Sequence, residues 1–307
     1  MFYTIIYTKN MSNIIINKKH INSRSGNNKL RYEFPSTVEF KEGDQLATAH
    51  INLFYSWFNI SLKHNNNFFQ YKWWDAQGHL TLIVDVLIPD GYYSTESFYE
   101  WFRGFMANKG HVLETIEDGN YIFFIELLTN ETYYANDFRL ASLSQQMDFG
   151  SGMALYSDYC KTVTDWIPPD TFEVPQIIIP SNNKFGELFG YNPQTIIPNA
   201  EISQVKNAFY SNLNDKSPEI VPSSTFILTC NLVDNSLSFD NNMLTAFTLP
   251  NGVGFGDSIN IDNALLWSNI TPGKYNYIDI TIIDQNYELL QIIDPNILIQ
   301  LTIIKHE

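Results

Sequence analysis

Cysteine and basic residues are both scarce in this chain of 307 residues. Its two cysteines, Cys160 and Cys230, belong to no C-x-x-C pattern, which excludes a disulfide framework and predicts a reducing environment. Lys and Arg number 18 against 33 Asp and Glu, so the net charge is −15, and the basic residues form no long run. A chain of this charge lacks the basic surface that a nucleic-acid backbone requires, and we expect no direct nucleic acid binding.

Long apolar segments are absent as well. No run approaches the roughly twenty apolar residues of a membrane-spanning helix, so we expect no transmembrane segment. The first residues, MFYTIIYTKN, are too brief an apolar stretch for a signal peptide and lack its positive front. The expected setting is therefore the cytosol, the nucleus or a virus assembled there.

Two glycine-rich segments lack the residues that would make them catalytic. The cluster GVGFGD (252–257) has no phosphate-loop lysine, and its spacing differs from the dinucleotide fingerprint. It predicts a β-turn or bulge rather than a phosphate site. Ser151 lies in GSGMA (150–154), which is not the G-x-S-x-G nucleophile elbow.

Metal-ligand and acid–base patterns are also missing. No histidine pair forms H-x-x-x-H or H-E-x-x-H, and no D-x-D-x-D-G loop occurs. The histidines are His20, His50, His64, His79, His111 and His306. The acidic pairs are Glu117 with Asp118, Asp257 with Asp262, and Asp279 with Asp284. We predict no catalytic residues, no cofactor-binding residues, no metal ligands and no cofactor, and we expect that the protein is not an enzyme.

What the sequence has in abundance is β-strand pattern. Aromatic residues make up 15% of the chain, which suits β structure. Five segments after Thr225 read as strands separated by Pro, Gly, Asn and Asp: TFILTCNLVD, MLTAFTLPNG, ALLWSNITPG, KYNYIDITIIDQN and NILIQLTIIKHE. Four more follow Phe34: STVEF, ATAHINLFYSWFNISL, NNFFQYKWW and HLTLIVDVLIP. Eight or nine strands are the number that a jelly roll needs.

The middle of the chain has a different texture. Ser94 is a candidate N-cap for a helix that ends at Gly110, and its apolar residues recur at helical spacing. They are Phe98, Trp101, Phe102 and Phe105. YIFFIELL and ETYYANDFRL return to strand, and NKFGELFGY predicts a short helical turn. With no basic residues among them, the aromatic clusters YKWW and YEWF predict core or subunit packing rather than stacking on bases or sugars.

These patterns predict a mainly β fold, a single jelly-roll β-sandwich with an inserted α+β domain. The predicted parts are an N-terminal arm (1–33), a jelly-roll domain split into 34–89 and 221–307, and an insertion domain (90–220). Residues 1–33, with the β-prone IIYT and NIIIN, are an arm or a strand that leads into the fold, and an arm would either swap onto a neighbouring subunit or be a frayed terminus.

Four blocks, taken in order, resemble a known family. They are AHINLFYSWFNISLKHNNNFFQY (49–71), LIPDGYYSTESFYEWF (87–102), IIIPSNNKFGELFGY (177–191) and ILTCNLVDNS (227–236), with YIDITIIDQNYELLQIIDP and LTIIK after them. Together they are similar to the penton (minor capsid) protein of virophages and their Polinton-like and adintovirus relatives. The resemblance implies a jelly roll standing upright at icosahedral vertices, five copies per vertex, with the insertion facing outward. Trimers of a double jelly-roll major capsid protein would surround it.

The resulting hypothesis is a structural capsid protein, a homopentameric penton of the virion, assembled in the host cytoplasm. Five identical heterologous interfaces would close the ring. Two alternatives stay open at this stage. One is a carbohydrate-binding β-sandwich, such as a viral fibre or a lectin-like attachment protein. The other is a glycosidase that uses a pair of the acidic residues.

Overall fold

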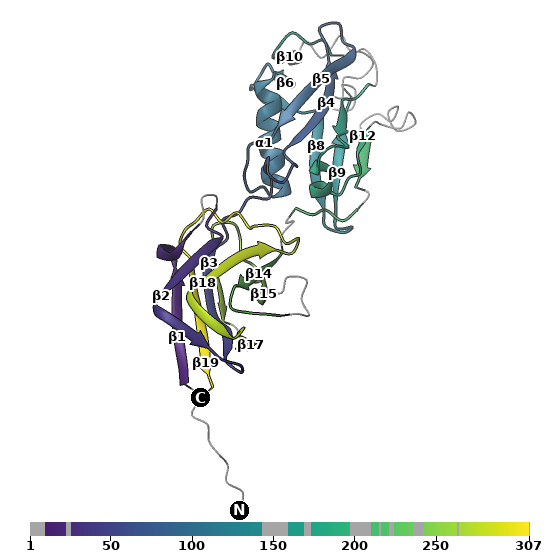
Figure 1. Cartoon of the computed structure of the whole chain (residues 1–307). Coiled ribbons are helices and arrows are strands. Elements are labelled where there is room, and N and C mark those ends of the chain that lie inside the picture. The colour runs from purple at the N-terminus through teal and green to yellow at the C-terminus, as the bar shows by residue number, and fades with distance from the viewer. Residues whose placement is uncertain are drawn as a thin grey trace, which may run out of the picture. The chain divides into compact units, whose positions relative to one another are not determined.

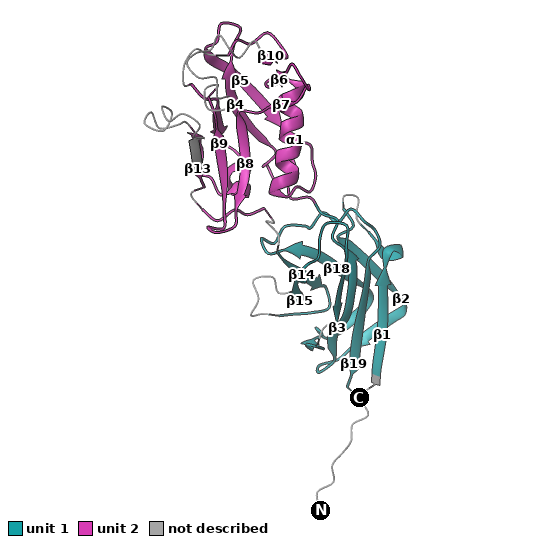
Figure 2. Cartoon of the chain, turned by 180° about the vertical axis from the view of Figure 1, so that it is seen from behind, with its two compact units in different colours: residues 1–57, 223–307 teal, residues 58–222 magenta. Residues whose placement is uncertain are grey.

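The computed structural model describes residues 10–22, 26–142, 159–168, 173–196, 210–214, 216–220, 224–235, 242–262 and 264–306. The chain forms two compact units, which Figure 2 colours separately. The sandwich unit comprises residues 1–57 and 223–307, and the insertion unit comprises residues 58–222.

The sandwich unit consists of two antiparallel sheets. Its elements are β1 (Asn10–Asn17), η1 (Lys18–His20), β2 (Lys29–Phe40), β3 (Gln45–Phe54), β14 (Thr225–Cys230), β15 (Met243–Thr248), β16 (Ser258–Asp262), β17 (Ser268–Asn269), β18 (Gly273–Asp284) and β19 (Leu298–Lys305). One sheet has the order β1-β19-β3-β16, with the short β17 also on β3, and the other has the order β15-β14-β18-β2. Strands β1 and β19, from opposite ends of the chain, lie side by side (Figure 1).

This strand order is that of a jelly roll. If the eight main strands are numbered along the chain, the sheets read 1-8-3-6 and 5-4-7-2. The chain therefore crosses between the sheets repeatedly, as it does in the two Greek keys of a double-sheet jelly roll. The predicted mainly β fold, a jelly-roll sandwich, is confirmed.

Alternating apolar residues explain how the sandwich holds together. On β18, Ile278, Ile280 and Ile282 are buried at every second position, and Leu30 of β2 pairs with Ile280. Side chains two residues apart lie on the same face of a strand, so this period of two lines one face of the sheet. Burying that face is the main source of stability in such a core.

Hydrogen bonds between loops stabilise the end of the sandwich from which the insertion leaves. Tyr55, just after β3, accepts from the Gly256 amide and donates to the carbonyl of Asp257. The next residue, Ser56, accepts from the Ile293 amide. On the same loop as Ile293, the Ile292 carbonyl accepts from the Asn27 amide. The loops before β16, before β19 and before β2 thereby form one connected end.

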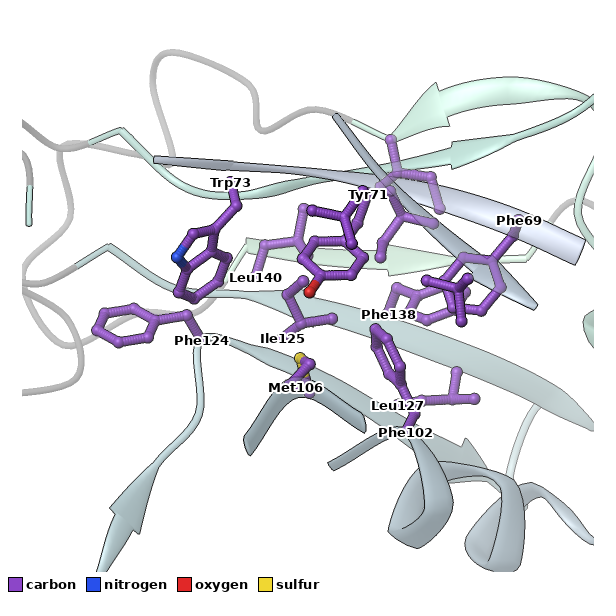
Figure 3. Packing of buried hydrophobic residues seen from close by; sticks show 14 of the residues in the cluster. Phe69, Tyr71, Trp73, Phe102, Met106, Phe124, Ile125, Leu127, Phe138 and Leu140 are labelled. Carbon is purple, nitrogen blue, oxygen red and sulfur yellow. The ribbon is translucent and has the colours of Figure 1, made fainter. Parts of the chain in front are cut away.

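The insertion unit is an α+β body with an aromatic core. Its elements are β4 (Phe68–Trp74), β5 (Leu80–Leu87), α1 (Thr95–Asn108), β6 (Leu113–Thr115), β7 (Tyr121–Ile122), β8 (Ile125–Asn130), β9 (Ala135–Leu140), β10 (Cys160–Thr162), β11 (Gln176–Ile179), α4 (Phe185–Phe189), β12 (Gln194–Ile196) and β13 (Tyr210–Leu213). Three sheets, β12-β11-β4-β5, β13-β9-β8 and β10-β6-β7, accompany α1. Figure 3 shows Phe69 and Tyr71 of β4 opposite Phe102 and Met106 of α1.

The two predicted helical segments form α1 and α4 where the sequence places them. Ser94 caps α1 in a capping box with Ser97, and Gly110, with φ +71°, follows the last turn. Phe98 and Phe102 lie on the buried face. The turn NKFGELFGY contains α4, which ends at Gly190 in the left-handed conformation.

The boundaries of the units differ from the predicted ones. Strands β4 and β5, expected in the jelly-roll segment 34–89, belong to the insertion unit, because β4 pairs with β11 (Tyr71 opposite Ile177). The insertion therefore starts at Phe58 instead of residue 90, and it ends at Pro222 instead of residue 220. Alternation shows that a strand has a buried face, but not which sheet it joins.

The predicted arm (1–33) also differs. Its residues Asn10–Asn17 form β1, which pairs with β19 of the same chain along its whole length, and Lys29 begins β2. Residues 1–9 lie outside the described part of the chain. In the sandwich, β1 and the unpredicted β16 take the places that we had expected β4 and β5 to fill.

Candidate assembly surface

The aromatic clusters singled out in the sequence lie in the core of the insertion unit. Tyr71, Trp73 and Trp74 of the YKWW cluster are fully buried. In the YEWF cluster Phe102 is fully buried, while Trp101 packs against the core from its rim. Core packing, one of the two outcomes predicted for them, is what the structure shows, and the three buried residues of YKWW offer no stacking platform to a base or a sugar.

The glycine cluster GVGFGD forms the turn that precedes β16. The Val253 amide donates to the carbonyl of Pro250, and the Asp257 amide donates to that of Gly254. The amides of Gly254 and Gly256 are also used, by the Asp257 side chain and by Tyr55. The predicted turn is confirmed. Because these amides already have partners, they are not available to bind a phosphate.

The histidines and acidic residues singled out in the sequence form pairs at most in the structure, not larger clusters, among the described residues. His50 contacts Asp262 at 2.7 Å, and Arg31 forms two 2.7 Å contacts with Asp279. Among the described residues, no group of three or more His, Cys, Asp or Glu side chains could hold a metal ion. Ser151 lies outside the described residues.

Neither cysteine has an activating environment. Burial is the main cause that raises the pKa of both thiols, to about 12 for Cys230. A thiol with a raised pKa is a poor nucleophile, because the thiolate is the reactive form.

The sandwich unit has an uncharged edge strand, β1. In the described part of the chain, β1 lies at the edge of its sheet, and its sequence NMSNIIIN has neither charge nor proline. Met11 is 61% exposed and Ile15 is 53% exposed, while Ile16 is fully buried. The ladder from β1 to β19 runs without a register shift. An uncharged edge strand with exposed apolar side chains is a template on which a strand of another chain can pair.

The other three edges of the sandwich are interrupted or charged. Strand β2 contains Pro35 and a bulge against β18, and β15 has a bulge against β14 near Leu228. Strand β16 ends in the exposed Asp262. Proline, bulges and charges are the devices that prevent edge-to-edge pairing, and β1 lacks them.

The insertion unit has an apolar edge strand of its own. β5 ends the sheet β12-β11-β4-β5, and its Ile83 and Leu87 are 54% and 64% exposed. Asp85, between them in sequence, is the only charged residue of β5. We call β1 and β5 the apolar edge strands. The sequence predicts a strand at β5 and an arm or a strand at β1, and the edge position of both depends on which strands pair.

The outer face of the β1-β19-β3-β16 sheet is polar by contrast. Asn52 donates to Asn260 on the neighbouring strand β16, and Thr302 donates to Asn13 on β1. These side chains thus pair with each other across neighbouring strands of the sheet. The exposed apolar area of this sheet is thus concentrated on its edge strand.

No helix in the described ranges is both long enough and apolar enough to cross a membrane.

No protein-family model and no curated protein sequence matches the chain. Among solved structures, the mavirus penton protein is similar, with 11% identity and a TM-score of 0.45 over 97% of this chain and 98% of that one. A chain in the cryo-EM structure of the Sputnik virophage has 10% identity and a TM-score of 0.39 over 97% of each chain. The chain is similar over nearly its whole length to a penton protein, the kind of protein that the four sequence blocks resemble. Both likenesses are distant, so the jelly-roll assignment rests on the strand order.

Proposed function

We propose that the protein is a structural, non-enzymatic capsid protein, a homopentameric penton at the icosahedral vertices of a virophage-type capsid. The observation that carries the proposal is the jelly-roll strand order, interrupted between its third and fourth strands by the insertion unit. Jelly rolls recur in viral capsid and lectin domains. The four sequence blocks that resemble virophage pentons favour a capsid protein over a lectin.

The mechanism is assembly by surface burial. The sandwich is a rigid block whose edge strand β1 leaves Met11 and Ile15 exposed. Burying such residues against a different surface of the next copy gives a heterologous contact, and five such contacts close a ring. A stable contact of this kind buries roughly 800 Å² on each partner. Trimers of a double jelly-roll major capsid protein are the neighbours expected around the ring in the virion, which we expect to assemble in the host cytoplasm.

A second candidate is a carbohydrate-binding attachment protein. Tyr133 and Tyr134 are both exposed at the turn between β8 and β9, where aromatic faces are open to a sugar. Binding to a glycan array by a protein that stays at low oligomeric state would favour this candidate over the penton.

The mass of the purified full-length chain tests the proposal. Light scattering followed by negative-stain imaging is expected to show pentamers and five-fold rings, alone or after mixing with a major capsid protein. A strict monomer at every concentration, even in that mixture, would rule out the penton.

A further inference from the structure

A histidine is enclosed in the aromatic core of the insertion unit. His111 follows Gly110 at the end of α1, and its backbone amide donates to the Met106 carbonyl. The residue is only 7% exposed. Its ring stacks on Trp73, with centroids 5.0 Å apart and planes 9° from parallel, and its Nδ1 lies 2.6 Å from the Tyr71 hydroxyl.

No carboxylate pairs with this ring among the described residues. Of the polar groups near the ring, Tyr71 comes from β4 and Lys109 from the end of α1. The positive charge of Lys109 disfavours a second positive charge on the His111 ring. On the adjoining strands β6 and β10, Glu114 and Lys161 contact each other at 3.5 Å. The thiol of Cys160 is buried and neutral. An imidazolium here would therefore have no anionic partner, which is costly in an apolar interior.

The hydroxyl of Tyr71 is the hydrogen-bond partner of the His111 ring, at 2.6 Å from Nδ1. Burial raises the pKa of Tyr71, so its hydroxyl keeps its proton, and it donates to Nδ1 when the neutral ring carries its own proton on Nε2. A protonated ring would instead donate from Nδ1 to the hydroxyl oxygen, and its positive charge would stay in the apolar core without an anionic partner. Burial first, and Lys109 second, lower the pKa of His111 from 6.5 to about 4.

We propose that His111 makes the insertion unit an acid-sensitive element, whose aromatic core opens when the ring is protonated while the sandwich unit stays folded. In the unfolded unit, His111 takes up a proton below the ordinary histidine pKa of 6.5. In the folded unit, it does so only at lower pH. The stabilising effect of the neutral ring is thus complete at neutral pH and is lost as the pH falls from about 6.5 toward about 4. The sandwich lacks an equivalent group, since its histidines His20, His50 and His306 are at least partly exposed.

Hydrogen exchange of the full-length chain, followed by mass spectrometry between pH 7 and pH 4, tests the location of the opening. After correction for the intrinsic pH dependence, peptides from α1 and β4 should lose protection first, while those from β18 and β19 stay protected. Loss of protection in both units at the same pH would overturn the proposal.

A substitution tests the residue. In His111→Gln the group that takes up the proton is gone, so the acid midpoint of tryptophan fluorescence should move down by about one pH unit. His79→Gln is the matched control, because the His79 side chain is 73% exposed, and its midpoint should equal that of the unchanged protein. An unchanged midpoint in His111→Gln contradicts the proposal.

A direct titration covers the case in which His111→Gln fails to fold. The ring resonance of His111 in the isotope-labelled, unmodified chain should stay that of a neutral ring until the core signals change. A ring that titrates near pH 6.5 while the core signals stay constant would overturn the proposal.

Discussion

The side-chain amide of Asn59 donates to the carbonyl of Ile220, 2.8 Å away and 161 residues later in the chain. The same amide nitrogen donates to the carbonyl of Tyr93 at 2.7 Å, and its Oδ1 accepts from the Tyr93 amide. Asn59 is buried. One side chain therefore holds together the start and the end of the insertion unit.

Asn59→Ala should destabilise the insertion unit by about 2–4 kcal/mol, because partly buried backbone groups of Tyr93 and Ile220 would lose the partner that the buried Asn59 side chain provides. Chemical denaturation, followed by the tryptophans of this unit, measures the change. Asn260→Ala, which removes an exposed amide from β16, should stay within about 0.5 kcal/mol. Equal stability of the two variants would show that the hydrogen bonds of Asn59 contribute nothing to the stability of the insertion unit.

Lysine on the uncharged edge should prevent assembly without unfolding the sandwich. Met11→Lys and Ile15→Lys each place a charge on β1, and charged edges resist pairing with another chain. We expect a monomeric mass by light scattering, together with an unchanged circular dichroism spectrum. Ser36→Lys, on the already interrupted edge β2, is the control and should assemble normally. Full assembly of both β1 variants would exclude β1 from the subunit contact.

The capping box of α1 offers a coupling measurement. The Ser94 hydroxyl accepts from the Ser97 amide, and the Ser97 hydroxyl accepts from the Ser94 amide at 2.8 Å. Ser94→Ala should cost about 1 kcal/mol of stability. The double substitution with Ser97→Ala should cost less than the sum of the single ones, because the two bonds stabilise the same first turn. Strict additivity in urea denaturation would argue against a shared role.

Removing one aromatic ring from the insertion core should be far more damaging than removing an exposed one. Phe102 is fully buried against Phe69 and Tyr71. Phe102→Ala should therefore cost about 3–5 kcal/mol. Tyr133→Ala, at the exposed turn between β8 and β9, should cost less than about 0.5 kcal/mol. Thermal unfolding of both variants gives the comparison, and a loss below 1 kcal/mol in Phe102→Ala would mean that the core repacks around the gap.

Local signals were the reliable part of the sequence. Ser94 and Gly110 delimit α1 correctly, because capping and a left-handed turn depend on residues within a few positions. The turn at 252–257 was predictable for the same reason. The sequence left an arm and a strand open for the segment of β1, since the pairing of β1 with β19 joins residues almost 300 positions apart.

The sequence alone determined that this chain forms about as many strands as a jelly roll needs, carries a helix in an insertion and lacks recognisable catalytic motifs. These properties follow from local periodicity, capping and composition. Only the tertiary structure decided that β4 and β5 belong to the insertion, that β1 is an open edge, and that His111 is enclosed against Trp73. Each of these depends on contacts between distant segments, and a residue's own pattern does not specify its partner.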